Sequence, residues 1–247
     1  MKLTERVYLV GSGAKGFHLT DTLDCHVYLI DGRGELALID SGAGYGTGEI
    51  INNIKKEGFD INQLKHLLLT HAHADHAGGA KNIVNKIGTQ VYASDLTAQY
   101  LENGDEDAIS LTSGKESGLY PKSYKYQATK VDRVVKEGDY ILVGDLKLTV
   151  INTPGHSNDH ISFLMESGEV KYLFAGDLVF YEGKIATQNI YDCNVYEIGK
   201  SIQKLKQENI DVLLAGHDSI VLKKGQDHIN MGINYYENSI IPPSIIY

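Results

Sequence analysis

The stretch that most constrains this chain is THAHADHAGG, residues 70–79. It places three imidazoles and one carboxylate in a short loop, at His71, His73, Asp75 and His76. Imidazole and carboxylate groups are ligands that zinc, iron and manganese accept. The apolar run Leu64–Leu69 comes directly before the loop and predicts a strand buried on both faces. The stretch therefore predicts a metal site at the carboxyl end of a strand, where loops of α/β folds often carry function.

Composition and charge narrow the classes of partner. The 247 residues are 42% hydrophobic and 22% charged, as in an ordinary soluble globular protein. The formal net charge of −9 argues against nucleic acid as a partner, because nucleic-acid-binding faces are basic. The same charge gives little attraction to an anionic membrane surface. We therefore expect a small-molecule substrate, with neither nucleic acid nor membrane as a partner.

The cysteines and the N-terminus predict a cytoplasmic protein. Cys25 and Cys193 are far apart in the sequence and form no metal-binding spacing, so both are expected to be free thiols. The N-terminal residues contain no secretory signal, and no apolar run is long enough to span a membrane.

Strand and helix patterns occur in two successive sets. In the first set, apolar runs at 24–31 and 35–40 flank a Gly-containing turn and predict a β-hairpin that ends at Asp40. Its other expected elements are a helix over about 48–56, the strand 64–69, a helix over 77–87 and a strand over 90–94. The second set has expected strands at 131–135, 139–143, 146–153, 160–166, 170–177 and 211–217, and helices at about 194–207 and 227–237. Because no linker-like composition separates the sets, we expect one α/β (α+β) domain over residues 1–247, with two similar halves whose sheets pack face to face.

Two segments stand apart from this pattern. Residues 95–130 are polar and rich in Gly, Asp, Tyr and Lys; we expect a helix at Leu96–Leu101 and an excursion or lid over the remainder, where substrate contacts are most expected. The apolar tail IIPPSIIY, residues 240–247, predicts packing across the domain or a subunit interface, which leaves a homodimer open.

Three more ligand-type residues come at the ends of predicted strands: His156 in TPGHS, Asp177 in AGD and His217 in AGH. Singly, a His or Asp after a strand is most often a surface residue, a turn or a helix cap. Here each follows an apolar strand and a Gly, which lets the backbone turn sharply. Seven such residues in this order indicate one common metal-binding crevice.

The ordered motifs THAHADH, TPGHS, AGD and AGH resemble the metallo-β-lactamase superfamily of hydrolases, from the hairpin ending at Asp40 to His217. The resemblance implies an αββα four-layer sandwich with a dinuclear metal site. It implies that one metal is held by His71, His73 and His156, and the second by Asp75, His76 and His217, with Asp177 as the bridge. Two divalent ions are thus expected, with zinc as the first choice and iron or manganese as alternatives.

Further residues are candidates for supporting roles. Asp40 resembles the family's buried carboxylate, which would hydrogen-bond the loop backbone or a ligand imidazole; the alternative is a simple turn residue. His160 is either a pocket or ligand-contacting residue or a solvated strand side chain. Tyr181 is a candidate for contacting the substrate oxyanion, with Phe180 as the alternative pocket residue. His228 is a weaker candidate for the cleft.

The expected activity follows from the resemblance to the glyoxalase II and lactonase branches. Hydroxide activated by two metals would attack an acyl bond of a small molecule, a thioester or a lactone, while Asp75 orients the nucleophile and carries its proton. The alternative is an iron persulfide dioxygenase, because His71, His156 and Asp177 alone would make a two-His-one-carboxylate site. Phosphodiester hydrolysis is disfavoured by the negative charge and by the lack of an RNA-binding arm.

Overall fold

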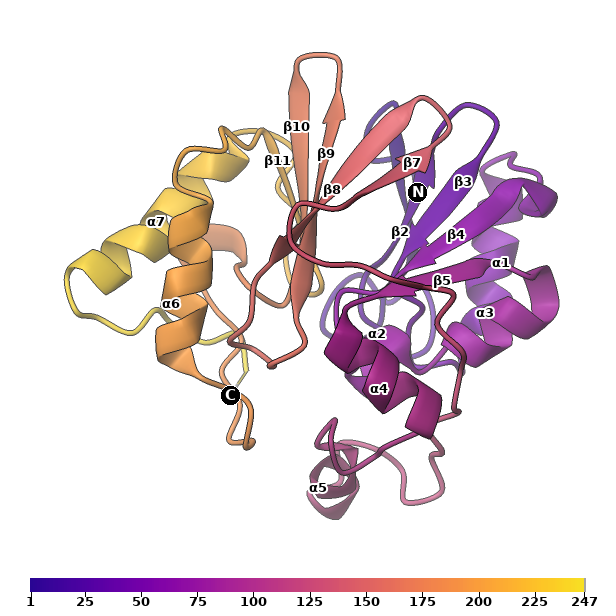
Figure 1. The fold of residues 1–247 in the computed structure, drawn as a ribbon, viewed down its shortest axis with the longest axis horizontal. Helices are drawn as coiled ribbons and strands as arrows, with labels where there is room; N and C mark the ends of the chain where they lie inside the picture. The colour runs from indigo at the N-terminus through magenta and orange to yellow at the C-terminus, as the bar shows by residue number, and fades with distance from the viewer. Residues whose placement is uncertain (247) are drawn as a thin grey trace. The chain divides into compact units, whose positions relative to one another are not determined.

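The computed structural model describes residues 1–246, which form two compact units (Figure 1). Unit 1 comprises residues 1–135 and 143–145, and unit 2 comprises residues 136–142 and the chain from Leu146 onward. Tyr247, the last residue of the predicted apolar tail, lies outside the described residues. That the whole chain forms a single domain stays a prediction.

A six-stranded sheet in the order β1-β2-β3-β4-β5-β6 organises unit 1. Its strands are β1 (Val7–Gly11), β2 (Val27–Asp31), β3 (Leu36–Ile39), β4 (Leu64–Leu68), β5 (Gln90–Ala93) and β6 (Arg133–Val134). β1, β2 and β3 pair antiparallel, so the predicted hairpin ending at Asp40 is confirmed. β4, β5 and β6 continue the sheet in parallel with β3, which brings the carboxyl ends of β3 and β4 to the same edge.

The helices of unit 1 are α1 (Thr47–Lys56), η1 (Ile61–Gln63), α2 (Ala74–Ala77), α3 (Ala80–Ile87), α4 (Asp95–Asn103) and α5 (Leu111–Glu116). Of these, α1 and α3 lie against one face of the sheet (Figure 1). Ile50 of α1 and Ile83 of α3 are fully buried in one apolar cluster with Leu29 of β2 and Leu38 of β3. The i, i+4 spacing of Ile50 and Ile54 in α1 presents both to that cluster.

Two predictions for unit 1 need correction. The helix expected over 77–87 begins only at Ala80, because Gly78-Gly79 separates α2 from α3. At Gly79 a Cβ would lie 2.2 Å from the carbonyl oxygen of Ser41, so the chain passes too close there for any other residue. The strand expected to be buried on both faces is exposed at Lys65, near its start.

The segment 95–130 is packed more firmly than a solvated excursion would be. The expected helix at Leu96–Leu101 is confirmed as part of α4, whose first turn is capped by the side chain of Ser94. α5 follows, and Tyr120, Tyr124 and Tyr126 then join the apolar core of unit 1. These three tyrosines are all less than a tenth exposed.

Unit 2 is built on a five-stranded sheet in the order β11-β10-β9-β8-β7. Its strands are β7 (Tyr140–Val143), β8 (Leu146–Asn152), β9 (Ile161–Ser167), β10 (Val170–Gly176) and β11 (Val212–Ala215). β8, β9 and β10 pair antiparallel, whereas β11 runs parallel to β10. The carboxyl ends of β10 and β11 are therefore neighbours.

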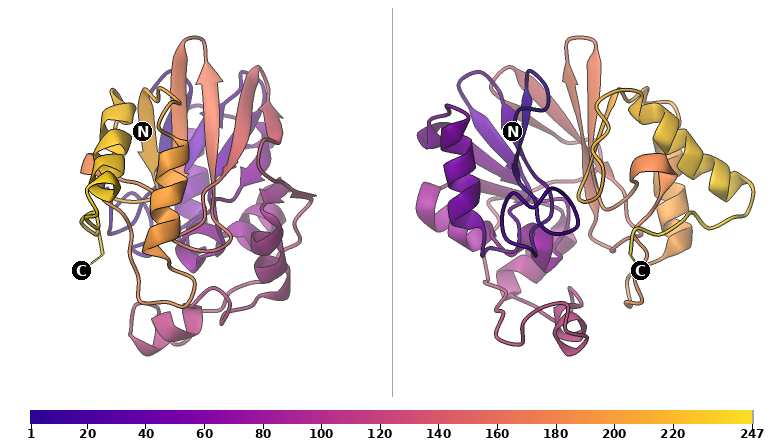
Figure 2. Two further views of the ribbon diagram at one scale, coloured as in Figure 1. Left: turned by 60° about the vertical axis from the view of Figure 1, so that its left-hand side comes forward. Right: turned by 180° about the vertical axis from the view of Figure 1, so that it is seen from behind.

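Two helices cover one face of the unit 2 sheet. α6 (Val195–Lys204) and α7 (Gly225–Glu237) lie side by side (Figure 2), and the short η2 (Tyr181–Gly183) follows β10. Ile198 and Ile202 of α6 pack with Ile229 of α7 and with Leu173 and Leu213 of the sheet. α6 begins where predicted because the side chain of Asn194 accepts the N–H groups of its first turn.

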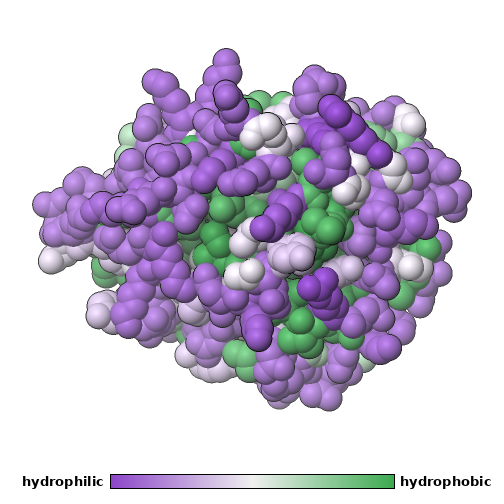
Figure 3. All heavy atoms as spheres, turned by 45° about the horizontal axis from the view of Figure 1, so that its top comes forward, coloured by the Kyte–Doolittle hydropathy of each residue, from purple (hydrophilic) through white to green (hydrophobic). Residues whose placement is uncertain are grey.

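The molecular surface is mostly polar, as expected from the composition. The face drawn in Figure 3 is mostly hydrophilic, with its hydrophobic residues in patches bordered by polar ones. Among the described residues, no helix has both the length and the apolar character needed to cross a bilayer.

Candidate metal centre

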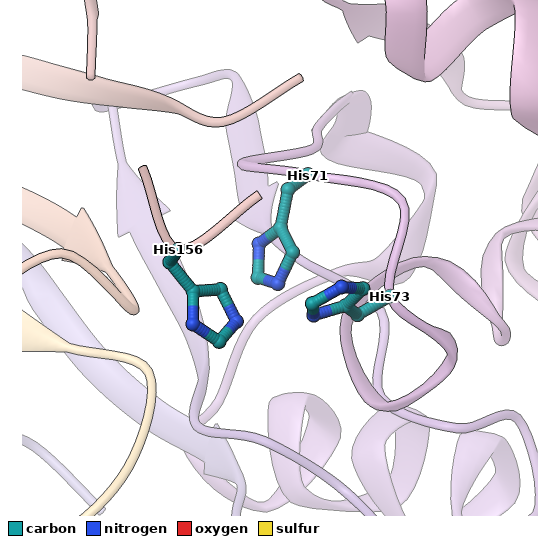
Figure 4. A group of neighbouring side chains, drawn as sticks. All are labelled: His71, His73 and His156. Atoms are coloured by element: carbon teal, nitrogen blue, oxygen red, sulfur yellow. The ribbon is translucent and has the colours of Figure 1, made fainter. Parts of the chain in front are cut away.

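The predicted ligands of unit 1 gather on the loop that joins β4 to α3. The ring centroids of His71 and His73, both drawn in Figure 4, lie 4.6 Å apart. Those of His71 and His76 lie 4.1 Å apart. Asp75 lies beside them, with its Oδ2 at 3.8 Å from Nε2 of His76. The loop therefore brings four of the seven predicted ligands together.

Asp40 anchors this loop from the end of β3. Its Oδ1 accepts the N–H of Thr70 at 2.8 Å, and its Oδ2 accepts the hydroxyl of Thr70 at 2.8 Å and Nδ1–H of His76 at 2.9 Å. Because the Thr70 hydroxyl donates to Asp40, it accepts from Nδ1–H of His71, at 3.0 Å. In its neutral form, each of these imidazoles thus carries its proton on Nδ1 and its lone pair on Nε2, the form in which a ring can bind a metal.

The conformation of Asp40 suits this position. Its φ is +62°, a left-handed value that Asp tolerates better than most residues do. The parallel pairing of β3 and β4 explains why its carboxylate reaches Thr70, since the two strands end at the same edge. Asp40 thus hydrogen-bonds both the loop backbone and the imidazole of His76, and its role beside a metal stays a prediction.

His156 of unit 2 follows β8, in a loop that depends on Gly155. Gly155 has a φ of +140°, and a Cβ there would lie 2.3 Å from the backbone nitrogen of Ile198, so no other residue fits without displacing α6. The ring of His156, also drawn in Figure 4, donates from Nδ1 to the carbonyl oxygen of Ala186 at 3.0 Å. In its neutral form, this ring therefore also carries its lone pair on Nε2.

Asp177 and His217 come from the neighbouring ends of β10 and β11. The N–H of Gly216 donates to the carbonyl oxygen of Gly176 at 2.7 Å, which holds the two strand ends together. Oδ2 of Asp177 lies 3.5 Å from Nε2 of His156 and 3.6 Å from Nε2 of His217. One carboxylate oxygen of unit 2 thus faces Nε2 of two imidazoles.

These distances fit a metal ion. Two atoms that bind one tetrahedral zinc ion at about 2.1 Å lie roughly 3.4 Å apart. The Asp177 contacts match this separation, and the Asp75–His76 contact exceeds it by a few tenths of an ångström. The donors are imidazoles and carboxylates, a set that zinc, iron and manganese all accept.

His160 is buried and is bonded to a predicted ligand. Its side chain is 1% exposed, so the alternative of a solvated strand residue is excluded. Nε2 accepts the backbone N–H of Asp177 at 3.0 Å, and Nδ1 donates to the hydroxyl of Thr153 at 2.9 Å.

Tyr181 is partly exposed and lies beside His228, whereas Phe180 is buried. Tyr181 begins η2 and is 38% exposed, with its ring centroid 4.7 Å from that of His228. His228 accepts the N–H of Glu182 at 3.0 Å through Nδ1. Phe180 is fully buried, in a small apolar cluster with Ala186 and Ala215.

Sequence reasoning missed Tyr120. Its hydroxyl donates to Oδ1 of Asp75 at 3.1 Å, from the middle of the segment 95–130. Burial raises the pKa of the Tyr120 hydroxyl well above its usual value, so the group remains a donor. Tyr120 belongs to no recognisable sequence motif. The only sequence signal for it is that it lies in a short segment with several other tyrosines.

Cys25 also lies closer to the loop than expected. Its sulfur is within 4.8 Å of ligand-type atoms of Asp40 and His76. Burial raises the pKa of its thiol to about 12, and the thiol donates to the carbonyl oxygen of His26. Both cysteines are free, as predicted.

The sequence profile of the Metallo-beta-lactamase superfamily matches residues 20–217, which include every predicted metal ligand. The chain belongs to this superfamily and is a metal-dependent hydrolase. The solved structure of BJP-1, a subclass B3 metallo-β-lactamase of Bradyrhizobium japonicum, matches it with a TM-score of 0.73 and 28% identity, over 97% of this chain and 91% of that one. The predicted fold class is thereby confirmed.

Similar sequences come from several kinds of organism. The probable metallo-hydrolase YflN of Bacillus subtilis is 29% identical, over 83% of this chain and 84% of its own length. The hydroxyacylglutathione hydrolase GloC of Haemophilus influenzae is 30% identical, over 76% of this chain and 82% of its own length. The human acyl-coenzyme A thioesterase MBLAC2 is 28% identical over 65% of this chain, which spans only 60% of that relative's length.

Proposed function

We propose that the ligand residues of both units serve one dinuclear metal centre. The proposed ligands are His71, His73 and His156 for one ion, Asp75, His76 and His217 for the other, and Asp177 as the bridge. Three observations support this set: the clustering on the unit 1 loop, the contacts of Asp177 in unit 2, and a family match that spans both. Zinc is the proposed metal, with iron and manganese as alternatives.

The observation that carries the proposal is the position of Oδ2 of Asp177. It lies at nearly equal distances, 3.5 and 3.6 Å, from Nε2 of two imidazoles that are assigned to different ions. A carboxylate between two metal sites needs this placement, because it has to reach both. A structural ion pair would need only one imidazole partner.

We propose an acyl bond of a small molecule as the substrate, a thioester first and a lactone second. The names of two relatives support the thioester, since one is a hydroxyacylglutathione hydrolase and the other an acyl-coenzyme A thioesterase. The net charge of −9 supports a small molecule over a polyanion.

In the proposed reaction, bound metal ions supply Lewis-acid activation of water and of the carbonyl group. Asp75 orients the attacking water and then carries its proton toward the leaving group. The Nδ1 contacts of His71, His76 and His156 hold their rings in one orientation and one tautomer. Tyr181, which is 38% exposed, is the proposed contact for the substrate oxygen.

The test is a hydrolysis screen of protein whose metal content has been measured after purification without added metal. Thioesters, lactones and phosphodiesters are compared, with His71→Ala and Asp177→Ala as the site variants. We expect about two metal ions per chain, thioester or lactone hydrolysis, and loss of both in the variants. A single iron per chain with oxygen uptake on a persulfide would favour the dioxygenase instead, and full activity in either variant would refute the site.

A further inference from the structure

Three tyrosines of the segment 120–126 hold the ligand loop of unit 1. The hydroxyl of Tyr126 donates to the carbonyl oxygen of Ala72 at 2.8 Å. That of Tyr124 donates to the carbonyl oxygen of Ala43 at 2.8 Å and lies 3.5 Å from the carbonyl oxygen of Ala74 in the ligand loop. Tyr120 differs from both, because its hydroxyl donates to a side chain, Oδ1 of Asp75, at 3.1 Å. Of these bonds, only the one from Tyr120 reaches the side chain of a proposed metal ligand.

The hydroxyl of Tyr120 is held in place by packing. Its ring lies with its centroid 5.4 Å from that of Tyr124. α5 covers it closely, since a Cβ at Gly114 would lie only 3.0 Å from Cδ2 of Tyr120. The ring therefore has little freedom to turn its hydroxyl away from Asp75.

Residues earlier in the segment 95–130 also hold the three tyrosines. Glu106 accepts the N–H of Tyr126 at 3.1 Å and forms an ion pair with Lys115 of α5. Through these contacts, Glu106, α5 and the three tyrosines pack together as one substructure. Its role in the structure is thus to brace the ligand loop.

The two carboxylate oxygens of Asp75 have different surroundings. Oδ1 is held by the tyrosine, while Oδ2 lies 3.8 Å from Nε2 of His76. The last side-chain torsion of Asp is a soft one, so a carboxylate without such a bond turns easily. The backbone carbonyl of Asp75 accepts the N–H of Cys25 at 3.2 Å, which fixes the main chain but not this torsion.

We propose that Tyr120 is a positioning residue for Asp75, which presents Oδ2 to the second metal and aligns the same carboxylate for proton transfer. This inference rests on the proposed dinuclear site. It assigns the segment 95–130 a part in metal binding, whereas the sequence pointed only to substrate contacts.

The test compares Tyr120→Phe with two matched variants. Tyr126→Phe removes a buried hydroxyl that bonds the same loop at a backbone carbonyl, and Tyr196→Phe removes an exposed hydroxyl on α6. Zinc affinities of the two sites are measured by competition with a chromophoric chelator, along with kcat and KM for a thioester. Thermal melting of the metal-free proteins checks that each variant is folded.

We expect Tyr120→Phe to weaken the second zinc site by roughly 10- to 100-fold and to leave the first site within a few-fold of wild type. kcat should fall while KM changes little, because the carboxylate acts on the nucleophile. Tyr196→Phe should match wild type in every measurement. Tyr126→Phe should lower the melting temperature without this selective loss.

Two results would overturn the assignment to Tyr120: wild-type zinc affinities and kcat in Tyr120→Phe, or an equal and selective loss in Tyr126→Phe. In both, a wild type that binds two zinc ions and hydrolyses the thioester leaves the proposed function standing. A wild type that binds one ion or none would overturn the proposed function and this inference together.

Discussion

The backbone N–H of Asp177 donates a hydrogen bond to Nε2 of His160 over 3.0 Å. The ring completes its pattern by donating from Nδ1 to the hydroxyl of Thr153. An imidazole that accepts at Nε2 and donates at Nδ1 is neutral and in a single tautomer. β9, which His160 precedes, therefore supports the strand end at which Asp177 faces two other imidazoles.

Removing this acceptor should disturb Asp177. In His160→Ala the N–H of Asp177 would stay buried without its acceptor, which costs about 1–3 kcal/mol of folding free energy. Metal affinity should fall roughly 10- to 100-fold, as for other residues that support ligands. Urea unfolding and chelator competition measure the two effects. His160→Gln, whose side-chain oxygen can accept a hydrogen bond, is the rescue variant, and His160→Ala with wild-type affinity would contradict the role.

Asp40 can be replaced by a residue of the same shape, because Asn also tolerates a positive φ. The substitution therefore tests the hydrogen bonds of the carboxylate with little change in packing. In Asp40→Asn an amide group replaces one of the oxygens that accept from Thr70 and His76. If the amide nitrogen replaces Oδ1, it faces the N–H of Thr70, which holds the loop; if it replaces Oδ2, it faces Nδ1–H of His76, whose ring then loses its fixed orientation. We expect roughly 10- to 100-fold weaker metal binding with a folded protein, measured by metal titration and circular dichroism. Unchanged binding would mean that Asp40 is only a turn residue.

The sequence predicted the elements and the ligand-bearing strand ends because both signals are local. Apolar runs of strand length ended in Gly plus His or Asp at β8, β10 and β11, and the structure places Asp177 against His156 and His217 as that pattern implied. The start of α3 was misplaced because the helical pattern hides the close passage of Gly79 along Ser41, a contact between distant segments.

The supporting contacts were harder to predict. Tyr120 lies 45 residues from Asp75, in a segment without a regular pattern, so its bond depends on packing alone. Likewise, the burial of His160 depends on how β9 lies against the end of β10, and its spacing from His156 fits a solvated residue equally well.

Metal removal should lower both stability and activity. An ion present at 100 times its dissociation constant stabilises the folded state by about 2.7 kcal/mol. For a chain of this length, that corresponds to a melting temperature lower by roughly 5–10 °C after chelation. Differential scanning calorimetry of chelated and zinc-restored protein measures the change. Magnesium, a poor match for imidazole ligands, is the control ion; recovery with magnesium alone would contradict an imidazole-rich site.

Asp24 predicts a pH dependence that is separate from the metal ligands. Burial raises its pKa from 3.8 to about 6, although the N–H of Ala43 donates to its Oδ1 at 2.8 Å. Between about pH 4 and pH 6 the folded protein therefore holds a proton that the unfolded chain has released. Below about pH 4, Asp24 is protonated in both states and does not change the free energy of unfolding. As pH rises from about 4 through 6 the free energy of unfolding falls, and above about pH 6 it is lower by about 3 kcal/mol because of this group.

Asp24→Asn should remove that cost, since the amide oxygen can still accept from Ala43. We expect the variant to be more stable than wild type by up to about 3 kcal/mol at pH 8, with the difference vanishing near pH 4. Urea unfolding at pH 4, 6 and 8 measures it, with Glu116→Gln as a control for the loss of an exposed carboxylate. The opposite order at pH 8 would show that the charged carboxylate of Asp24 stabilises the fold.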